Sequence, residues 1–486
     1  MILKTYILLS LLLNMAFSAF YFNPENISLS NASALSYNDF RSLNAAATSE
    51  HKGLTLKLIG INMGFGNNFL SMSKYNDING ANFDDSTDPD GYYPKSEFDG
   101  LINEGLQLNS HLAFNLPFSD IVYNNISFHN RIYSIVDLEL PQSFIKLILY
   151  GNEANETYNL NGSSSINIFS ESSIGYSKKN DDFSFGIRLK YLQGLAYGEL
   201  LNLSDNSSYF VTDTTTGFMG QAKYLINQAV GGSGFAMDLG LIYNKSSELT
   251  YGISINNLLG KIYWDDNNIT YNSLRGTITN KLPLRHNEKQ YFSILLDTLN
   301  AMNIISMPLD QIYSTENFSV IEFDNLSDIP FNTDSLFNND ALIETEYGSY
   351  LLKTQDLSTN LINLFNLKSQ DYITDYPTYL NISLKKDFEE DMSLCLSLST
   401  SFSNSLRSTE EWKLSSGLLF NRFKNIPITL GFSITEKGKI NSGFSMGYKF
   451  GPIFINYGLN FKEAIFLQST KGIDFSFSLV FKTHKI

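Results

Sequence analysis

The chain is poor in cysteine, in charged residues and in positive charge. Its 486 residues include one cysteine, Cys395, so no internal disulfide can form and a disulfide-stapled fold is excluded. Charged residues make up 17% of the chain, below the roughly 25% of soluble domains. The formal net charge of −15 argues against a nucleic-acid partner, because such a partner requires a basic surface.

Motifs for catalysis and cofactor binding are also missing from the sequence. The five histidines show no H-x-H or H-x-x-x-H spacing that would place two metal ligands on one face; they are His51, His111, His129, His286 and His484. There is no Walker-type phosphate loop and no G-x-S-x-G elbow. We therefore predict no enzyme activity, no catalytic residues, no cofactor and no metal site, and the ligand-binding residues stay unknown.

One acidic stretch has oxygen donors at short intervals. Residues 84–91 read DDSTDPDG, with a glycine that allows a turn. The stretch lacks the bidentate Glu at the spacing of a calcium loop, although Glu97 is nearby. An exposed acidic loop is the commoner meaning of such a run, and calcium binding stays an open alternative.

Only the N-terminus carries a long apolar run. Lys4 gives it a positive start, residues 6–17 are largely apolar, and Ala16-Phe17-Ser18 offers small residues at a cleavage spacing. The run is too short to span a bilayer core of about 30 Å. We predict that residues 1–18 are a signal peptide and that the mature chain leaves the cytoplasm, with an ordinary N-terminal core helix as the alternative.

The most informative pattern is strict alternation of apolar and small polar residues. In residues 235–243, FAMDLGLIY, every second side chain is apolar, and the pattern resumes at 249–255 after a polar turn. Such alternation is typical of β-strands, because successive side chains point to opposite faces. Two runs joined by a short polar loop predict a β-hairpin.

The hairpin pattern recurs along the chain. Clear runs occupy residues 183–191, 235–243, 249–255, 392–402, 428–435, 444–450, 453–461 and 473–481. Weaker ones occupy residues 54–64, 106–116, 126–138, 166–176, 217–225, 379–386 and 412–420. Together they predict roughly fourteen strands, within the range of membrane barrels. Closing the sheet removes exposed edges, so the first and last strands should pair.

Two features favour a membrane barrel over a soluble sandwich. The runs are about ten residues long, the length that a tilted strand needs to cross a membrane. The opposite face is rich in Ser, Gly, Asn and Thr, which suits a crowded lumen better than a solvated sheet. We predict an all-β protein, a single antiparallel transmembrane β-barrel whose outer face contacts outer-membrane lipid.

Three regions interrupt the alternation. Residues 19–53 are polar and small; this N-terminal segment is a candidate lumen hatch, because a barrel can fold such a segment inward as a plug, and a disordered periplasmic tail is the alternative. Within the barrel at 54–486, insertions fall near residues 65–105 and 298–378. Short helices are expected at 98–102, 340–352 and 357–367, which makes the insertions partly helical.

Two inward-facing residues could have a chemical role. Asp238 could line a transport path, or it could be paired with a lumen cation such as Arg188 or Lys190. Cys395 is best interpreted as a small filler on the lumen face.

Several segments resemble known outer-membrane barrels. NASALSYND at 31–39 and SLNAA at 42–46 resemble the start of fatty-acid-transporter-like barrels, with Ala45 in place of the proline of their Asn-Pro-Ala element. FAMDLGLIY at 235–243, LLGKIYW at 258–264, YPTYLN at 376–381 and GYKFGP at 447–452 resemble the DUF5723 family of Bacteroidetes-like bacteria. That resemblance implies an outer-membrane barrel of the fourteen-strand type, in a family without a settled activity.

Two functions therefore remain open. In the first, the barrel is a channel or uptake protein for small apolar molecules, as the superfamily resemblance implies. In the second, it is a non-transporting structural or interaction scaffold at the cell surface, with a surface or periplasmic protein partner, for example in surface-protein export. A continuous path through the lumen would favour the first function, and a lumen filled by interlocked side chains would favour the second.

Overall fold

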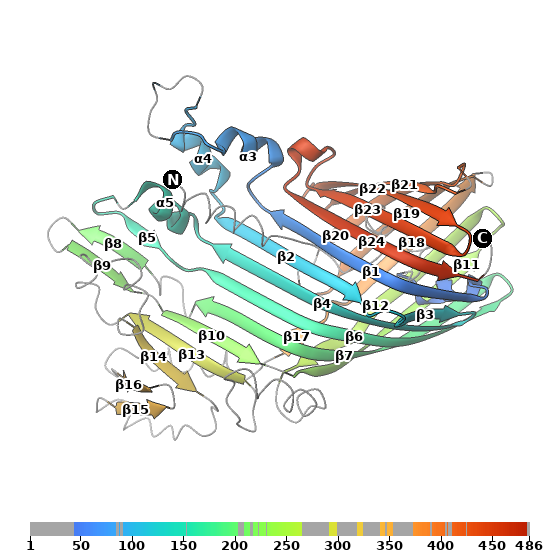
Figure 1. The fold of residues 1–486 in the computed structure, drawn as a ribbon, viewed down its shortest axis with the longest axis horizontal. Coiled ribbons are helices and arrows are strands. Elements are labelled where there is room, and N and C mark those ends of the chain that lie inside the picture. The colour runs from blue at the N-terminus through green and yellow to red at the C-terminus, as the bar shows by residue number, and fades with distance from the viewer. Residues whose placement is uncertain are drawn as a thin grey trace.

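A computed structural model shows a closed antiparallel barrel of fourteen strands (Figure 1). The structure describes residues 43–483 apart from 84–86, 88–90, 152, 203–208, 214–216, 222, 230, 265–290, 299–317, 324–340, 346–347, 353–372, 389–390, 404–405, 407–410 and 424. Within these residues no helix has the length and apolar character required to cross a bilayer.

The ring follows the order of the sequence. Its strands are β1 (Leu54–Asn67), β2 (Leu106–Asn115), β4 (Ile126–Leu140), β6 (Ser163–Asn180), β7 (Phe183–Asn202), β11 (Ser233–Asn244), β12 (Leu249–Tyr263), β18 (Tyr379–Phe388), β19 (Met392–Ser401), β20 (Trp412–Phe420), β21 (Ile428–Thr435), β22 (Ile440–Phe450), β23 (Ile453–Lys462) and β24 (Gly472–Lys482). Short strands β3 (Asp120–Tyr123) and β17 (Ile373–Asp375) continue β2 and β18 along the same neighbours.

Pairing of β1 with β24 closes the barrel, in a register that runs from Thr55↔Lys482 to Gly66↔Gly472. The predicted pairing of the first and last strands is therefore confirmed. Eight clear and six weaker alternating runs each became one strand of the ring, so both the fold class and the strand number predicted from the pattern are confirmed.

The prediction that residues 217–225 form a strand of the barrel wall is wrong. It forms β9 (Gly217–Gln221), which pairs with β8 (Tyr209–Asp213), and the start of β10 (Lys223–Ala229). The strand β7 is 20 residues long and has two partners on the same side. Its residues 183–193 pair with β11 within the ring, and its residues 197–202 pair with β10. The sheet extends from β10 through β13 (Tyr291–Thr298) to β14 (Phe318–Phe323), outside the ring, and β5 (Thr157–Asn159) pairs with β8.

The barrel is apolar outside and polar inside. The outward side chains of Phe235, Leu189 and Ile174 are 71%, 59% and 63% exposed, whereas inward Lys190 and Asp238 are 4% and 1% exposed. A soluble domain buries its apolar residues and exposes its charges. The inverted distribution is typical of a barrel whose surroundings are lipid.

The two ends of the barrel differ in their connections. Short turns join β6 to β7 and β11 to β12 at one end, where β24 also ends, and long connections lie at the other (Figure 1). The long-connection end carries α3 (Met72–Ile78), α4 (Lys95–Leu101) and α5 (Gln142–Tyr150), and η5 (Leu467–Ser469) lies between β23 and β24. Phe98 and Ile102 are buried there with Ile145 and Tyr150 packed against them.

The helices expected in the insertions have mixed outcomes. The helix expected at 98–102 is confirmed by α4. The helix expected at 340–352 is wrong, because β15 (Ala341–Thr345) and β16 (Gly348–Leu352) pair there as an antiparallel hairpin. The two strands are short, and Gly348, which pairs with Thr345 at the start of β16, disfavours a helix there. The stretch 357–367 lies outside the described residues.

The segment before the barrel is described from residue 43 onward. It forms a single 3₁₀ helix, η1 (Ala45–Glu50), which packs on β6, β7 and β11. The predicted signal peptide and residues 19–42 lie outside the described part, so the proposed division at residues 18 and 53 stays a prediction.

Candidate functional site in the barrel lumen

The inward residues of β7 define three layers along the barrel axis. From the long-connection end, Leu192 belongs to an aromatic layer, Lys190 and Arg188 to a charged layer, and Gly186 to the layer that holds η1. The neighbouring strand β11 follows the same order, because its inward residues pair with those of β7 in antiparallel register. Alternation places every second residue in the lumen, so the order of the sequence sets the order of the layers.

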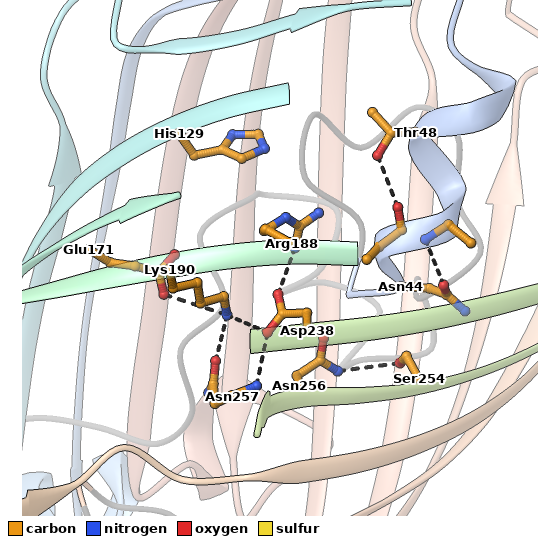
Figure 2. A network of polar contacts seen from close by, with 12 residues as sticks. Asn44, Thr48, His129, Glu171, Arg188, Lys190, Asp238, Ser254, Asn256 and Asn257 are labelled. Atoms are coloured by element: carbon orange, nitrogen blue, oxygen red, sulfur yellow. Dashed lines mark hydrogen bonds and ion pairs between the residues drawn. The ribbon is translucent and has the colours of Figure 1, made fainter. Parts of the chain in front are cut away.

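Asp238 is the centre of the charged layer (Figure 2). Arg188 Nη1 lies 3.0 Å from Asp238 Oδ2, and Lys190 Nζ lies 2.7 Å from Oδ1. The main-chain N–H of Asn257 donates to Oδ1 at 2.8 Å. All three charged side chains are at most 3% exposed. The predicted pairing of Asp238 with a lumen cation is confirmed, and both named cations are its partners.

A second carboxylate extends this network to the next strand. Lys190 Nζ lies 3.6 Å from Glu171 Oε2 on β6, and the hydroxyl of Tyr376 donates to the same oxygen. Tyr376 comes from the connection between β17 and β18, and its ring lies 5.7 Å from Lys190 Nζ. Asn257 also donates through Nδ2 to the carbonyl oxygen of Pro377 at 2.9 Å. The layer therefore joins β6, β7, β11, β12 and the start of β18.

An irregularity in the wall creates part of this geometry. The pairing of β11 with β12 shifts register twice, between Phe235 and Met237 and between Met237 and Leu239. Asn257 has a φ of 58°, a left-handed conformation that asparagine tolerates better than most residues. We infer that this bulge turns the Asn257 N–H toward Asp238. Alternation alone could not have revealed it, because a bulge changes the phase of the pattern.

A separate charged cluster lies on β1, β3 and β4. Asp120 accepts from Arg131 Nη2 at 2.8 Å, His129 Nδ1 lies 2.9 Å from its Oδ1, and Lys57 Nζ lies 3.8 Å from its Oδ2. All four residues are at most 2% exposed. Sequence analysis missed this cluster, although His129 and Arg131 have the i, i+2 spacing that places both in the lumen.

The aromatic layer lies beside Glu171, on the side of the long connections. Its buried residues are Ala113, Tyr133, Ile135, Phe169, Leu192, Ala236, Ile262, Trp264, Tyr376 and Leu406. Tyr133 and Phe169 stack with ring centroids 4.9 Å apart, and Tyr376 meets Phe169 edge-on at 5.7 Å. Trp264 Nε1 donates to Thr374 Oγ1 at 2.8 Å, which satisfies its one polar group.

Helix η1 rests on two glycines of the lumen wall. A Cβ at Gly186 would lie 2.3 Å from the main chain of Ala45, and one at Gly240 would lie 2.1 Å from Asn44 Oδ1. Asn44 caps η1 by accepting from the Ala46 N–H. Its Nδ2 also donates to the carbonyl oxygens of Leu241 and Ile253, each at 3.1 Å. The absence of side chains at the glycines allows backbone to lie directly on backbone.

The far end of η1 is held at the short-turn end of the barrel. Glu50 Oε1 accepts from Lys179 Nζ at 2.7 Å and from Asn244 Nδ2 at 3.3 Å. His51 Nε2 lies 2.9 Å from Thr55 Oγ1 on β1. The described part of the N-terminal segment is therefore anchored at both ends of its helix, inside the mouth of the barrel.

Comparison with known proteins places the sequence in a family. The model of the "Family of unknown function (DUF5723)" matches residues 45–458, from η1 to β23. The chain belongs to the DUF5723 family. This confirms the family that the sequence motifs indicated, and no curated protein matches this DUF5723 chain.

Several solved structures are similar to this DUF5723 barrel. The Ralstonia pickettii toluene transporter TbuX is 10% identical, with a TM-score of 0.45 over 97% of this chain and 99% of its own. The Pseudomonas putida toluene transporter TodX is 12% identical, with a TM-score of 0.44 over 96% and 100%. A Pseudomonas aeruginosa FadL homologue is 12% identical, with a TM-score of 0.43 over 96% and 100%.

The other residues singled out from the sequence of this DUF5723 member lie apart from the charged layer. Cys395 is fully buried on the inner face of β19 and packs with Leu419. His111 Nε2 contacts Asn62 Oδ1. His286, His484 and most of the stretch 84–91 lie outside the described residues, so calcium binding there stays untested. Among the described residues, no group of three or more His, Cys, Asp or Glu side chains could hold a metal ion.

Replacing Gly240 with alanine is expected to lift η1 from the wall of this DUF5723 barrel. The added Cβ would lie 2.1 Å from Asn44 Oδ1 and 2.8 Å from the Ala46 N, so η1 or the wall must move. We expect a cysteine introduced at Ala47, where the native side chain is 6% exposed, to react with a maleimide several-fold faster in this background. Gly100→Ala is the control, since a Cβ there meets nothing within 4 Å. Unchanged labelling would contradict the direct contact between η1 and Gly240.

Proposed function

We propose that this protein is an outer-membrane channel or uptake protein for small molecules, closed in the conformation described here. The observation that carries the proposal is the inverted barrel, with apolar side chains outside and buried ion pairs inside. Barrels of this construction reside in membranes, because among β-sheets only a closed one satisfies every backbone group there. By the general rule that outer-membrane barrels have short periplasmic turns, the end that holds η1 faces the periplasm.

In this proposal the N-terminal segment acts as the lumen hatch. The support is the way η1 is held against the lumen wall. It lies on Gly186 and Gly240, and it is fixed by the buried Asn44 and by the Glu50–Lys179 ion pair. Opening the channel then requires η1 to leave the wall or the wall to move away from η1.

The cargo in this proposal is a small, mainly apolar molecule. Its contact surface would be the aromatic layer, where Tyr133, Phe169 and Trp264 are buried together in the closed conformation. The alternative, a non-transporting scaffold with a surface or periplasmic partner, is favoured by the interlocked charged layer beneath it, whose side chains are almost fully buried. The two functions differ in whether the lumen can conduct.

The location is tested by fractionation. As an apolar-faced barrel, the protein is expected in outer-membrane fractions, extractable only with detergent. Unboiled samples should migrate differently from boiled ones on gels, because the closed barrel resists unfolding by detergent. Recovery of the chain in the soluble periplasmic fraction would overturn the proposed location.

Deletion of residues 19–53 tests the channel directly. We expect the truncated protein to remain a folded barrel, because β1 begins at Leu54, and to admit small solutes in liposome-swelling assays. The intact protein, and a variant with Lys261→Ala on the outer surface, serve as matched controls. A folded truncated barrel with unchanged conductance would favour the scaffold.

A further inference from the structure

Residues 373–378 follow directly on the longest connection between wall strands, which runs from the end of β12 to β17. We call these residues the strap. The inward side chains of Thr374 and Tyr376 are 7% and 2% exposed. Asp375 between them points outward, where it is paired with Lys261. The strap is therefore a piece of the wall whose alternate side chains are buried in the lumen.

The strap contacts a strand that is not its neighbour in the wall. Thr374 Oγ1 donates to Asn167 Oδ1 at 3.1 Å, and the hydroxyl of Tyr376 donates to Glu171 Oε2. Both acceptors lie on β6, which β7, β11 and β12 separate from the strap along the wall. Trp264 Nε1 also donates to Thr374 Oγ1 at 2.8 Å. The strap thus joins β12 to β6 through the lumen.

The strap also contacts the charged layer, through Asn257. The carbonyl oxygen of Pro377 accepts from Asn257 Nδ2 at 2.9 Å, and Thr378 Oγ1 donates to the carbonyl oxygen of Asn257 at 3.0 Å. The same asparagine donates its main-chain N–H to Asp238 and accepts from Lys190 through Oδ1. One residue therefore joins the strap to both an anion and a cation of the layer, so a displaced strap changes the contacts of Asp238.

Helix η1 adjoins the charged layer on the side opposite to the strap (Figure 2). Gly240 is the next inward residue after Asp238 on β11, and Gly186 pairs with Gly240 on β7. Consecutive inward residues of a strand are about 7 Å apart. The backbone of η1 lies directly on both glycines, with no flexible side chain between them. Because a close-packed interior transmits displacements, a change in the charged layer reaches η1.

We propose that the strap and η1 are coupled through the charged layer, so that displacement of the strap loosens η1 from the wall and displacement of η1 loosens the strap. The coupling connects the long-connection end of the barrel with its short-turn end. It goes beyond the proposed function, because it holds whether or not the lumen conducts. Coupling between two sites is reciprocal, so both directions can be measured.

The first direction is tested with Tyr376→Phe, which removes one hydroxyl of the strap and keeps the ring. The reporter is Ala47→Cys on η1 in the full-length protein, with the native thiol removed by Cys395→Ala. Ala47 is 6% exposed, so its labelling by a maleimide reports local opening of η1. Coupling typically changes an equilibrium about 5- to 150-fold, so we expect labelling to be at least about 5-fold faster in Tyr376→Phe.

Tyr197→Phe is the matched control. The Tyr197 hydroxyl donates to Glu199 Oε2 at 2.7 Å, so this variant removes the same kind of hydrogen bond outside the strap and the charged layer. It should leave the labelling of Ala47→Cys unchanged. Thr374→Val is a second strap variant, which removes the hydroxyl between Trp264 and Asn167 and should also accelerate labelling. Heat-modifiable migration on gels identifies the variants that form a barrel.

The reverse direction uses Trp264 as the reporter. The chain has two tryptophans, and Trp412→Phe leaves only the one whose Nε1 donates to the strap. We expect Gly240→Ala, which displaces η1, to shift the emission of Trp264 to longer wavelength, because water then reaches the strap. Gly100→Ala, where a Cβ meets nothing within 4 Å, should leave the emission unchanged.

Three results would each overturn the coupling. They are unchanged labelling of η1 in the strap variants that form a barrel, equal acceleration in Tyr197→Phe, and unchanged Trp264 emission in Gly240→Ala. None of these measurements involves transport. A coupled barrel that never conducts would therefore overturn only the channel function, and a conducting barrel without coupling would overturn only the link between the strap and η1.

Discussion

Replacing Asp238 with leucine is expected to lower the free energy of unfolding by about 3–5 kcal/mol, the cost of breaking a buried ion pair by removing one partner. Arg188 would lose its carboxylate, and Lys190 would keep the longer contact of 3.6 Å to Glu171 and its hydrogen bond to Asn257 Oδ1. The Asn257 N–H would also lose its acceptor. Urea unfolding of the protein refolded in lipid vesicles, followed by tryptophan fluorescence, measures the change.

The matched control for Asp238→Leu is an exposed ion pair. Lys261 and Asp375 lie 3.5 Å apart with side chains about half exposed, and such pairs contribute about 0–1 kcal/mol. Lys261→Ala should therefore change the unfolding free energy little. A third variant replaces Asp238, Arg188 and Lys190 together with apolar residues, and it should recover part of the loss because no uncompensated charge remains among the three. A small effect of Asp238→Leu alone would mean that water reaches the charged layer.

Replacing Leu239 with arginine is expected to cost about 2–4 kcal/mol, the cost of placing a cation on the lipid face near the bilayer midplane. Leu239 points outward, 37% exposed, between Ile187 on β7 and Ile255 on β12. Leu479 on β24 lies on the same apolar face, between Ile59 and Ile455. The same unfolding measurement in vesicles applies to both positions.

Two control variants test whether the loss of stability comes from placing a charge on the lipid-facing side of the wall. Leu239→Met keeps the apolar character and should cost less than about 1.5 kcal/mol. Ser478→Thr, on the inner face beside Leu479, should be far milder than Leu479→Arg. The inner residue Gly240 is a poor mild control, contrary to what alternation alone implies, because η1 leaves no room for a side chain there. Equal sensitivity of both faces would indicate a soluble two-sided core.

Alternation predicted the barrel wall well because one physical rule sets it. Lipid outside and a crowded polar lumen inside impose a period of two on every wall strand, so most strands could be read from local sequence. The rule failed at residues 217–225, where the alternation continues into strands outside the ring. Alternation with a period of two shows that a strand has one apolar and one polar face. It does not show which strands will be its neighbours.

The lumen was predicted only in part, because its contacts depend on which rows meet across the barrel. Asp238 with Arg188 and Lys190 could be anticipated from inward positions on neighbouring strands. Tyr376 reaches the layer from a connection, and Asn257 reaches it through a bulge, and neither follows from alternation. The need for glycine at positions 186 and 240 also could not be predicted, because it arises from the contact with η1 in the folded barrel.

The seam between β1 and β24 has a consequence for how the barrel is made. It joins Thr55 to Lys482, so it can form only after the last wall strand has been synthesised. Until then β1 exposes a long row of unpaired backbone groups, an edge that invites pairing with other chains. Most other wall pairings join strands that are close in sequence and can form early, whereas this one bears the entropic cost of a very long loop. Until the seam closes, the unpaired edge of β1 is a site at which the newly made chain can pair with another chain and aggregate, and closure of the seam removes it.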